Sequence, residues 1–245
     1  MRKAALEFDV VTLFPGAFAG PLAYGMLGRA RRSGVLAVRL HDLRRFGVGP
    51  HRQVDDATYG GGGGMVLRPE PFFEAVEWIR ERFPARSERV VLLSPQGKRL
   101  VHGEAARLAG HERIVLLCGR DEGIDERVRE GLADEELSVG DVVVTGGELP
   151  ALMVIDAVSR FVPGVLGREE AVESDSFSEG GLDFPHYTRP ATYRGLDVPE
   201  VLLSGDHGAI ERWRSERALE ATRSKRPDLV VTDPRSRAPR RRQRG

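Results

Sequence analysis

Acidic side chains gather in the stretch that follows Cys118 and Gly119. Between residues 120 and 150 three residues are basic and ten are acidic: Asp121, Glu122, Asp125, Glu126, Glu130, Asp134, Glu135, Glu136, Asp141 and Glu148. A helix N-terminus normally attracts phosphate, but neighbouring carboxylates repel it. The stretch therefore favours a ligand that lacks phosphate and carries positive charge. S-adenosylmethionine, with its sulfonium and amino groups, fits this description, whereas a nicotinamide dinucleotide fits it poorly.

Two short apolar runs, residues 113–118 and 138–145, must position these side chains. Each run is rich in β-branched or other apolar residues, breaks at glycine and gives way to a helical pattern, over residues 124–134 and 148–161. In a parallel sheet, ligands bind in the crevice at the carboxyl ends of the strands. The sequence therefore predicts a ligand crevice built from the loops after these two runs.

The same alternation of strand and helix patterns extends through the first 160 residues. Further strands are expected at residues 7–13, 35–40 and 89–93, the last ending at the polar turn 94–97, and an amphipathic helix at 69–83. This pattern predicts an α/β fold with a largely parallel sheet and flanking helices. Five successive glycines, residues 60–64, indicate either free movement or close approach of the backbone to a ligand.

The charge is balanced overall but not evenly distributed. The formal net charge is +0, yet residues 205–245 contain twelve arginine and lysine residues against six acidic ones. Such asymmetry is typical of a basic arm that contacts phosphate. We predict a domain over residues 1–162, a flexible linker over 163–185, a small helical domain over 186–235 and a basic, disordered tail over 236–245.

Cysteine and hydropathy patterns indicate the compartment. The single cysteine, Cys118, excludes an intrachain disulfide, and no Cys/His cluster has the spacing of a zinc site. There is no apolar run near 18 residues and no signal-peptide pattern. These features predict a soluble cytoplasmic protein without a membrane partner.

An ordered set of strings resembles the bacterial tRNA (guanine-N1)-methyltransferase family TrmD, of the SPOUT class. The strings are LFP at 13–15, VDD at 54–56, LSPQG at 93–97, CGRDEGIDER at 118–127, GGELP at 146–150, SRFVPGVLG at 159–167, DSF at 175–177, PHYTRP at 185–190 and VLLSG at 201–205. This chain departs from the family pattern at Asp121, where many relatives carry an aromatic residue, and at Gly63, where proline is common.

The resemblance implies a fold and partners that the residue patterns alone do not. It implies a trefoil knot in the C-terminal half of the sheet, against the general rule that chains do not thread loops. It also implies a homodimer whose active site is shared between subunits. The reaction would be the methylation of N1 of the tRNA guanosine at position 37, just 3′ of the anticodon.

The resemblance also assigns site residues. Those implied for binding S-adenosylmethionine are Leu93, Ser94, Pro95, Gly97, Gly119, Arg120, Glu122, Gly123, Val139, Gly140, Asp141, Val142, Val143, Val144, Gly146, Gly147 and Pro150. It leaves open a Mg²⁺ ion with Glu122 as a ligand. Guanine N1 carries a proton, so the reaction needs a general base, and the resemblance implies Asp175 for that role. Arg160 would stabilise the negative charge that grows on O6. Expected tRNA contacts are Tyr59, His186, Tyr187, Arg189 and Arg214.

Two other functions remain to be weighed. One is a non-catalytic RNA-binding protein of the same fold, although binding alone needs neither Arg160 nor Asp175. The other is an NAD-type dehydrogenase, which would require a Gly-x-Gly-x-x-Gly turn after the first strand, and this chain lacks one.

Overall fold

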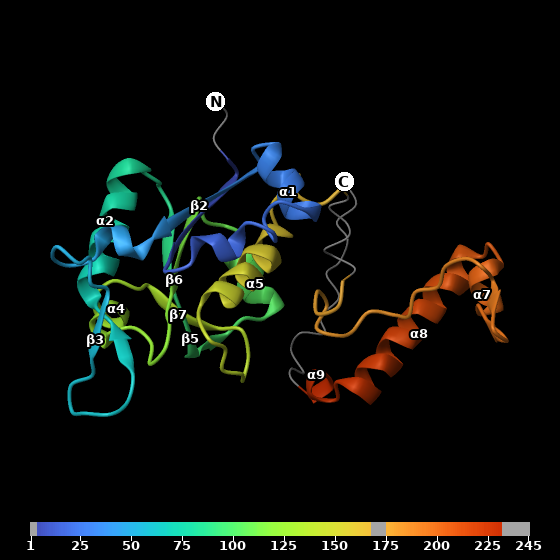
Figure 1. The fold of residues 1–245 in the computed structure, drawn as a ribbon. Helices are drawn as coiled ribbons and strands as arrows, with labels where there is room; N and C mark the ends of the chain where they lie inside the picture. The colour runs from blue at the N-terminus through green and yellow to red at the C-terminus, as the bar shows by residue number, and fades with distance from the viewer. Residues whose placement is uncertain (1–3, 168–174, 232–245) are drawn as a thin grey trace. The chain divides into compact units, whose positions relative to one another are not determined.

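The chain forms two compact units, residues 1–169 and 170–245, which we call unit 1 and unit 2 (Figure 1). The computed structural model describes residues 4–167 and 175–231. The predicted tail, residues 236–245, and part of the predicted linker therefore lie outside the described residues. No helix in the described ranges is long and apolar enough to cross a lipid bilayer.

Unit 1 is built on a five-stranded sheet. Its strands are β1 (Leu6–Thr12), β2 (Leu36–Asp42), β5 (Glu88–Arg99), β6 (Arg113–Cys118) and β7 (Glu135–Ser138), in the order β2-β1-β6-β5-β7. Every pair of neighbouring strands is parallel. The predicted α/β fold with a largely parallel sheet is confirmed, and all five carboxyl ends lie at one edge.

Helices cover both faces of this sheet (Figure 1). One face packs against α1 (Gly25–Arg32), α3 (His102–Leu108) and α5 (Glu148–Ser159), and the other against α2 (Pro69–Arg82) and α4 (Glu126–Gly131). Short 3-10 helices, η1 (Pro15–Phe18) and η2 (Leu43–Phe46), follow β1 and β2.

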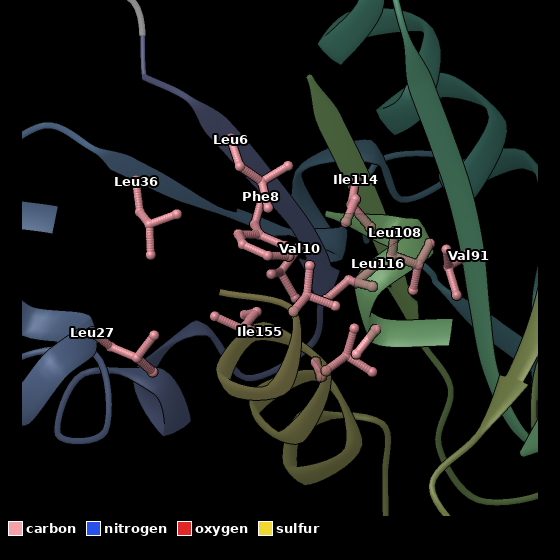
Figure 2. Close-up of a cluster of buried hydrophobic side chains, with 14 of the residues drawn as sticks. Leu6, Phe8, Val10, Leu27, Leu36, Val91, Leu108, Ile114, Leu116 and Ile155 are labelled. Carbon is pink, nitrogen blue, oxygen red and sulfur yellow. The ribbon is translucent and has the colours of Figure 1, made fainter. Parts of the chain in front are cut away.

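Alternation along the strands separates the core into two clusters. Phe8 and Val10 of β1 pack on the side of α5, where Ile155 joins them (Figure 2). Val11 points to the other face and packs with Phe72 of α2. Successive side chains of a strand point to opposite faces, so a sheet covered on both sides needs the continuous apolar runs seen here.

Two predicted strand boundaries are wrong. Strand β5 does not end at residue 93, because Leu93 and Lys98 both pair with Leu137 and the residues between them are looped out. The run 138–145 is not a strand, since β7 ends at Ser138. There the Ser138 hydroxyl donates to the Gly140 carbonyl (2.9 Å) and accepts from the Gly140 amide (3.2 Å), so a local turn replaces strand pairing.

A hairpin of β3 (Asp55–Ala57) and β4 (Met65–Leu67) carries the glycine run at its tip. Its second strand is fixed to the loop after β6. The Leu67 amide donates to the Gly123 carbonyl at 3.1 Å, and the Asp125 amide donates to the Leu67 carbonyl at 2.9 Å. The hairpin is therefore positioned beside the acidic stretch by backbone hydrogen bonds.

Unit 2 consists of a small hairpin and helices. The elements are β8 (Thr192–Tyr193), β9 (Leu196–Asp197), α7 (Glu200–Leu203), α8 (His207–Lys225) and α9 (Asp228–Val231). The Asp206 side chain caps α8 by accepting from the Ala209 amide at 3.0 Å. With 19 residues, α8 is the longest helix in the described part of this unit.

Candidate active site

A pocket of about 220 Å³ lies at the carboxyl ends of β5, β6 and β7. Of the residues predicted to bind the methyl donor, the pocket is lined by Leu93, Ser94, Pro95, Gly119, Arg120, Glu122, Gly123, Val139, Val142, Val143, Val144, Gly146, Gly147 and Pro150. The predicted Gly97, Gly140 and Asp141 lie outside the lining. An added Cβ at Gly97 would overlap the backbone of Leu137, so this glycine allows β5 and β7 to approach closely.

Negative charge dominates the pocket wall. Its lining includes the carboxylates of Asp121, Glu122, Glu126 and Glu136 and one guanidinium, that of Arg120. Glu126 pairs with Arg129 at 2.5 Å. Among the described residues, the other three carboxylates have no basic partner within 4.0 Å. Unpaired carboxylates attract a cation and repel phosphate.

Two adjacent glycines let the start of α5 approach the end of β6. A Cβ at Gly147 would lie 2.6 Å from the Cα of Cys118, and the Gly147 amide donates to the Gly119 carbonyl at 2.9 Å. Gly146 forms an antiparallel bridge with Arg120. Any side chain at Gly147 would push α5 away from the sheet and open this wall of the pocket.

Of the five successive glycines, the last, Gly64, lies against a residue of the pocket. A Cβ at Gly64, whose φ is +96°, would lie 2.6 Å from Cγ of Glu122, whereas Cβ atoms at the other four glycines would meet nothing within 4 Å. The sequence left mobility and close approach as alternatives. Only Gly64 makes the close approach, and it does so against a pocket carboxylate.

A buried contact at the first residue of α5 joins segments far apart in the sequence. The Thr12 hydroxyl donates to Oε1 of Glu148 at 2.6 Å, and it accepts from the Phe14 amide at 3.0 Å.

Burial, with a smaller contribution from Glu148, raises the pKa of the Cys118 thiol well above its ordinary value. The thiol therefore stays protonated and is unsuited to act as a nucleophile.

The two predicted catalytic residues lie in different units. Arg160 is the residue directly after α5, at its C-cap. Asp175 begins the described part of unit 2, and its backbone carbonyl accepts hydrogen bonds from the Ser178 amide (3.2 Å) and hydroxyl (2.7 Å). The residues between them that would connect the two, 168–174, lie outside the described ranges. The assignments of base and O6 partner stay predictions.

Three of the predicted tRNA contacts gather in unit 2. The Arg214 guanidinium lies 4.9 Å from the ring centre of Phe184, and the His186 ring lies 4.6 Å from the same ring. His186 also contacts Asp183 at 2.8 Å, and Tyr187 lies 6.3 Å from Trp213. Arg189 is exposed on the same segment as Tyr187, whereas Tyr59 belongs to unit 1, where it is 98% exposed.

Some lining residues were not predicted. They are Leu92, Gln96, Asp121, Ile124, Glu126, Glu136, Leu137, Ser138 and Thr145. Most of them are neighbours of predicted residues on the same three loops, and the density of acids after residue 119 was the available signal for the carboxylates. In the described part of the chain, no three His, Cys, Asp or Glu side chains are grouped to hold a metal ion, so magnesium at Glu122 stays a prediction.

Comparison with known proteins gives matches over nearly the whole chain. A sequence model of the family described as tRNA (guanine-1)-methyltransferase TrmD matches residues 6–232. A tRNA (guanine-N(1)-)-methyltransferase of Geobacter sulfurreducens is 51% identical over 225 residues, covering 92% of this chain and 91% of the relative. The protein of the same name from Anaeromyxobacter dehalogenans is 54% identical over 230 residues, covering 93% of this chain and 92% of the relative. The pocket and the described part of unit 2 both lie within the matched residues.

Proposed function

The chain belongs to the tRNA (guanine-1)-methyltransferase TrmD family, and we propose that it transfers a methyl group from S-adenosylmethionine to N1 of the tRNA guanosine at position 37. It is an enzyme that methylates guanine N1 in tRNA, as the names of relatives about half identical to it indicate. The observation that carries the choice of donor is the pocket with three unpaired carboxylates. Neither a dehydrogenase nor a non-catalytic RNA-binding protein accounts for both the match to methyltransferases and the carboxylates of the pocket.

The pocket residues suit this donor. Asp121, Glu122 and Glu136 offer negative charge to its sulfonium and amino groups, and the backbone of the 119–123 and 139–147 loops offers amides and carbonyls to its adenine edge. When bound, S-adenosylmethionine supplies a methyl group on positively charged sulfur, which a nucleophile can attack without a covalent enzyme intermediate. No phosphate-binding feature is needed for such a ligand.

Asp175 is the general base of the proposed mechanism. Guanine N1 is a poor nucleophile until its proton leaves, and a carboxylate within hydrogen-bond distance can accept that proton. The turn in which the Ser178 amide and hydroxyl bond the Asp175 carbonyl restrains the backbone of the proposed base.

Arg160 stabilises the charge that follows. As N1 loses its proton, negative charge grows on O6, and a guanidinium placed there stabilises it through a charge-assisted hydrogen bond. Arg160 directly follows α5, whose first turn forms part of the pocket wall through Pro150. One rigid helix thus connects the donor pocket to the residue that contacts O6.

The path of the chain after β7 supports a trefoil knot. β7 lies at the edge of the sheet, next to β5 and two positions from β6. The chain nevertheless returns to the end of β6, where Gly147 bonds Gly119 and Gly146 pairs with Arg120. Residues 142–147 of that return line the same pocket as Ser94, Pro95 and Gln96 of the segment looped out of β5.

An exposed apolar surface supports a homodimer with a shared active site. On α5, Leu149 is 61% exposed and Met153 is 52% exposed, and in the adjoining loop Val143 is 87% exposed. A helix that is apolar on its outer face needs a cover. Since Val143 also lines the pocket, a second copy seated here would complete the site. Met153→Glu should give a monomer in sedimentation; a stable dimer would contradict this surface as the interface.

The remaining features of the proposal concern unit 2, metal and location. Unit 2 binds tRNA through the aromatic and basic side chains around Phe184, and the enzyme acts in the cytoplasm, where its substrate is found.

A magnesium requirement with Glu122 as ligand stays a prediction. It would be seen as loss of activity in chelator and its recovery with added magnesium.

Labelled methyl transfer to tRNA transcripts tests the function. Transcripts with guanosine at position 37 should accept one methyl group at N1, and matched transcripts with another base there should accept none. Calorimetry should show S-adenosylmethionine binding to the protein alone. Absence of donor binding, or equal labelling of both transcripts, would overturn the proposal.

A further inference from the structure

Two guanidinium groups lie against one exposed phenyl ring beside the pocket. The Cζ atom of Arg120 lies 4.5 Å from the ring centre of Phe14, and that of Arg44 lies 5.4 Å from the same centre. Phe14 is 40% exposed, although it is large and apolar. The pocket mechanism uses neither Phe14 nor Arg44.

The order of the strands brings these three residues together. Phe14 follows β1, Arg44 lies in η2 after β2, and Arg120 follows β6. β2, β1 and β6 are neighbours and parallel, so their carboxyl ends meet at one edge. Phe14 is fixed there by its amide hydrogen bond to Thr12, and Arg44 by donation from Nη1 to the Leu13 carbonyl.

The two arginines of this cluster have few direct partners. Among the described residues, the Arg120 guanidinium has no carboxylate within 4.0 Å and no hydrogen-bond acceptor, and it lies against the Phe14 ring. A Cβ added at Gly146 would meet both its Nη1 (3.2 Å) and Oε2 of Glu148 (2.5 Å), so this carboxylate compensates part of the charge. Arg44 approaches Asp42 at 3.7 Å, and an exposed ion pair of this length contributes little. A cation–π contact holds a guanidinium by its face and does not consume its N–H donors.

The pocket mouth therefore has two sides of opposite charge. Toward the β3–β4 hairpin lies Glu122, whose amide contacts the Met65 carbonyl and whose side chain abuts Gly64. Toward the end of β1 lie Arg44 and Arg120 on Phe14. Phosphate would be repelled from the first side and bound on the second.

We infer that Arg44 and Arg120, held on the ring of Phe14, bind backbone phosphates of the tRNA next to the target guanosine. This inference rests on the proposed function and adds the direction from which the RNA enters. The donor's own carboxylate is the other oxyanion near the site. Arg44 does not line the pocket, so a site that uses both arginines matches the spaced phosphates of an RNA strand better than a single carboxylate.

The test compares Arg44→Gln with Arg45→Gln. Arg45 is the next residue of η2 and is also exposed, with no contact to Phe14 and no ion pair among the described residues. Arg44→Gln should weaken tRNA binding about tenfold at low salt and reduce the slope of log affinity against log salt by about one. Donor affinity should not change. Arg45→Gln should bind tRNA like the unaltered protein.

Two further variants separate the outcomes. Phe14→Leu keeps an apolar side chain but removes the ring, and it should weaken tRNA binding less than Arg44→Gln does. Arg120→Ala should weaken tRNA binding and reduce its salt slope; because Arg120 also lines the donor pocket, donor affinity is measured separately. If it weakens donor binding alone, or if Arg44→Gln leaves the salt slope unchanged in a protein that melts normally, the inference is overturned. If the unaltered protein fails to methylate tRNA, the proposed function falls, and the salt slopes still decide the phosphate site.

Discussion

The two units bury their side chains to very different extents. In unit 1 two apolar clusters lie on opposite faces of one sheet and are covered by helices. In unit 2, within residues 175–230, Thr222 alone is buried. There the larger contacts are ring and cation contacts at the surface, such as those of Phe184 with Arg214 and of Tyr187 with Trp213.

The difference in burial indicates that the two units have different functions. A close-packed core holds its side chains in fixed positions, which a pocket that orients a donor requires. A unit without such a core presents aromatic and basic side chains that can adapt to an RNA surface. Substitutions in the core and pocket walls of unit 1 should therefore act through folding or donor binding. Those in unit 2, like those at Arg44 and Arg160 of unit 1, should act through RNA binding or chemistry.

The largest expected effect is on chemistry from unit 2. Asp175→Asn removes the proposed base but retains the backbone carbonyl that Ser178 bonds. Methyl transfer should fall by about a thousandfold, the usual scale for a general base, while donor and tRNA affinities are retained. Single-turnover rates and separate binding measurements would show this. Glu179→Gln, an exposed acid nearby, is the control; normal turnover by Asp175→Asn would remove the base assignment.

A stability effect should come from the buried ion pairs of unit 1. The Asp9 carboxylate accepts from Nε and Nη2 of Arg39 at 2.7 Å and contacts His41 at 2.7 Å. Asp9→Asn should reduce the free energy of unfolding by about 2 kcal/mol at neutral pH, because it removes the charged acceptor shared by Arg39 and His41, although Arg39 keeps its ion pair with Glu7 at 2.7 Å. Chemical denaturation measures this, and Glu81→Gln on the exposed face of α2 should change little.

The effect of Asp9→Asn on the free energy of unfolding should depend on pH, and the direction follows from the pKa of Asp9. Burial favours the neutral form of Asp9, but hydrogen bonds from Arg39 and His41 outweigh it and hold the pKa of Asp9 below its ordinary value. The ionised carboxylate therefore stabilises the folded state above pH about 4, and this contribution is lost as pH falls through the folded pKa. The difference between the unaltered protein and Asp9→Asn should shrink at pH about 3. A constant difference would contradict the ion-pair explanation.

A smaller effect is expected on donor binding. Gly147→Ala places a Cβ 2.6 Å from the Cα of Cys118, so α5 must shift and widen the pocket. Overpacking of this kind costs about 2 kcal/mol, so the donor affinity measured by calorimetry should fall more than tenfold. Gly103→Ala in α3 is the matched control, since its Cβ meets nothing within 4 Å and alanine favours helix. Equal donor affinity in both variants would show that donor binding does not need the close approach of α5 to the end of β6.

The smallest effect tests unit 2 as an RNA surface. Phe184→Ala removes the ring that Arg214 and His186 contact, and each such contact is worth about 1 kcal/mol. tRNA affinity should fall about fivefold, without a change in donor binding or in the main melting transition. Ser215→Ala, exposed on α8, is the control. If Phe184→Ala lowers the main melting temperature, unit 2 contributes more to stability than its burial indicates.

Much of unit 1 could be predicted because its signals are local. Continuous apolar runs with β-branched residues fixed β6 as a strand, and helix periodicity placed α2 within one residue of its observed end. The errors fall where long-range pairing overrides local chemistry. Pro95 and Gly97 would end an isolated strand, yet Lys98 resumes pairing because β7 lies alongside. The run 138–145 has strand composition, but the turn at Gly140 removes it from the sheet.

The sequence by itself determined the class of fold, the excess of carboxylates after β6 and the family. Each follows from residue type and spacing over a short stretch or from ordered strings. Only the tertiary structure decided that Gly64 abuts Glu122, that Thr12 bonds Glu148 across 136 positions, and that Arg44 and Arg120 share one ring. These contacts depend on which strands become neighbours. β1 lies between β2 and β6, an order that depends on packing between segments distant in the sequence, and no local pattern encodes it.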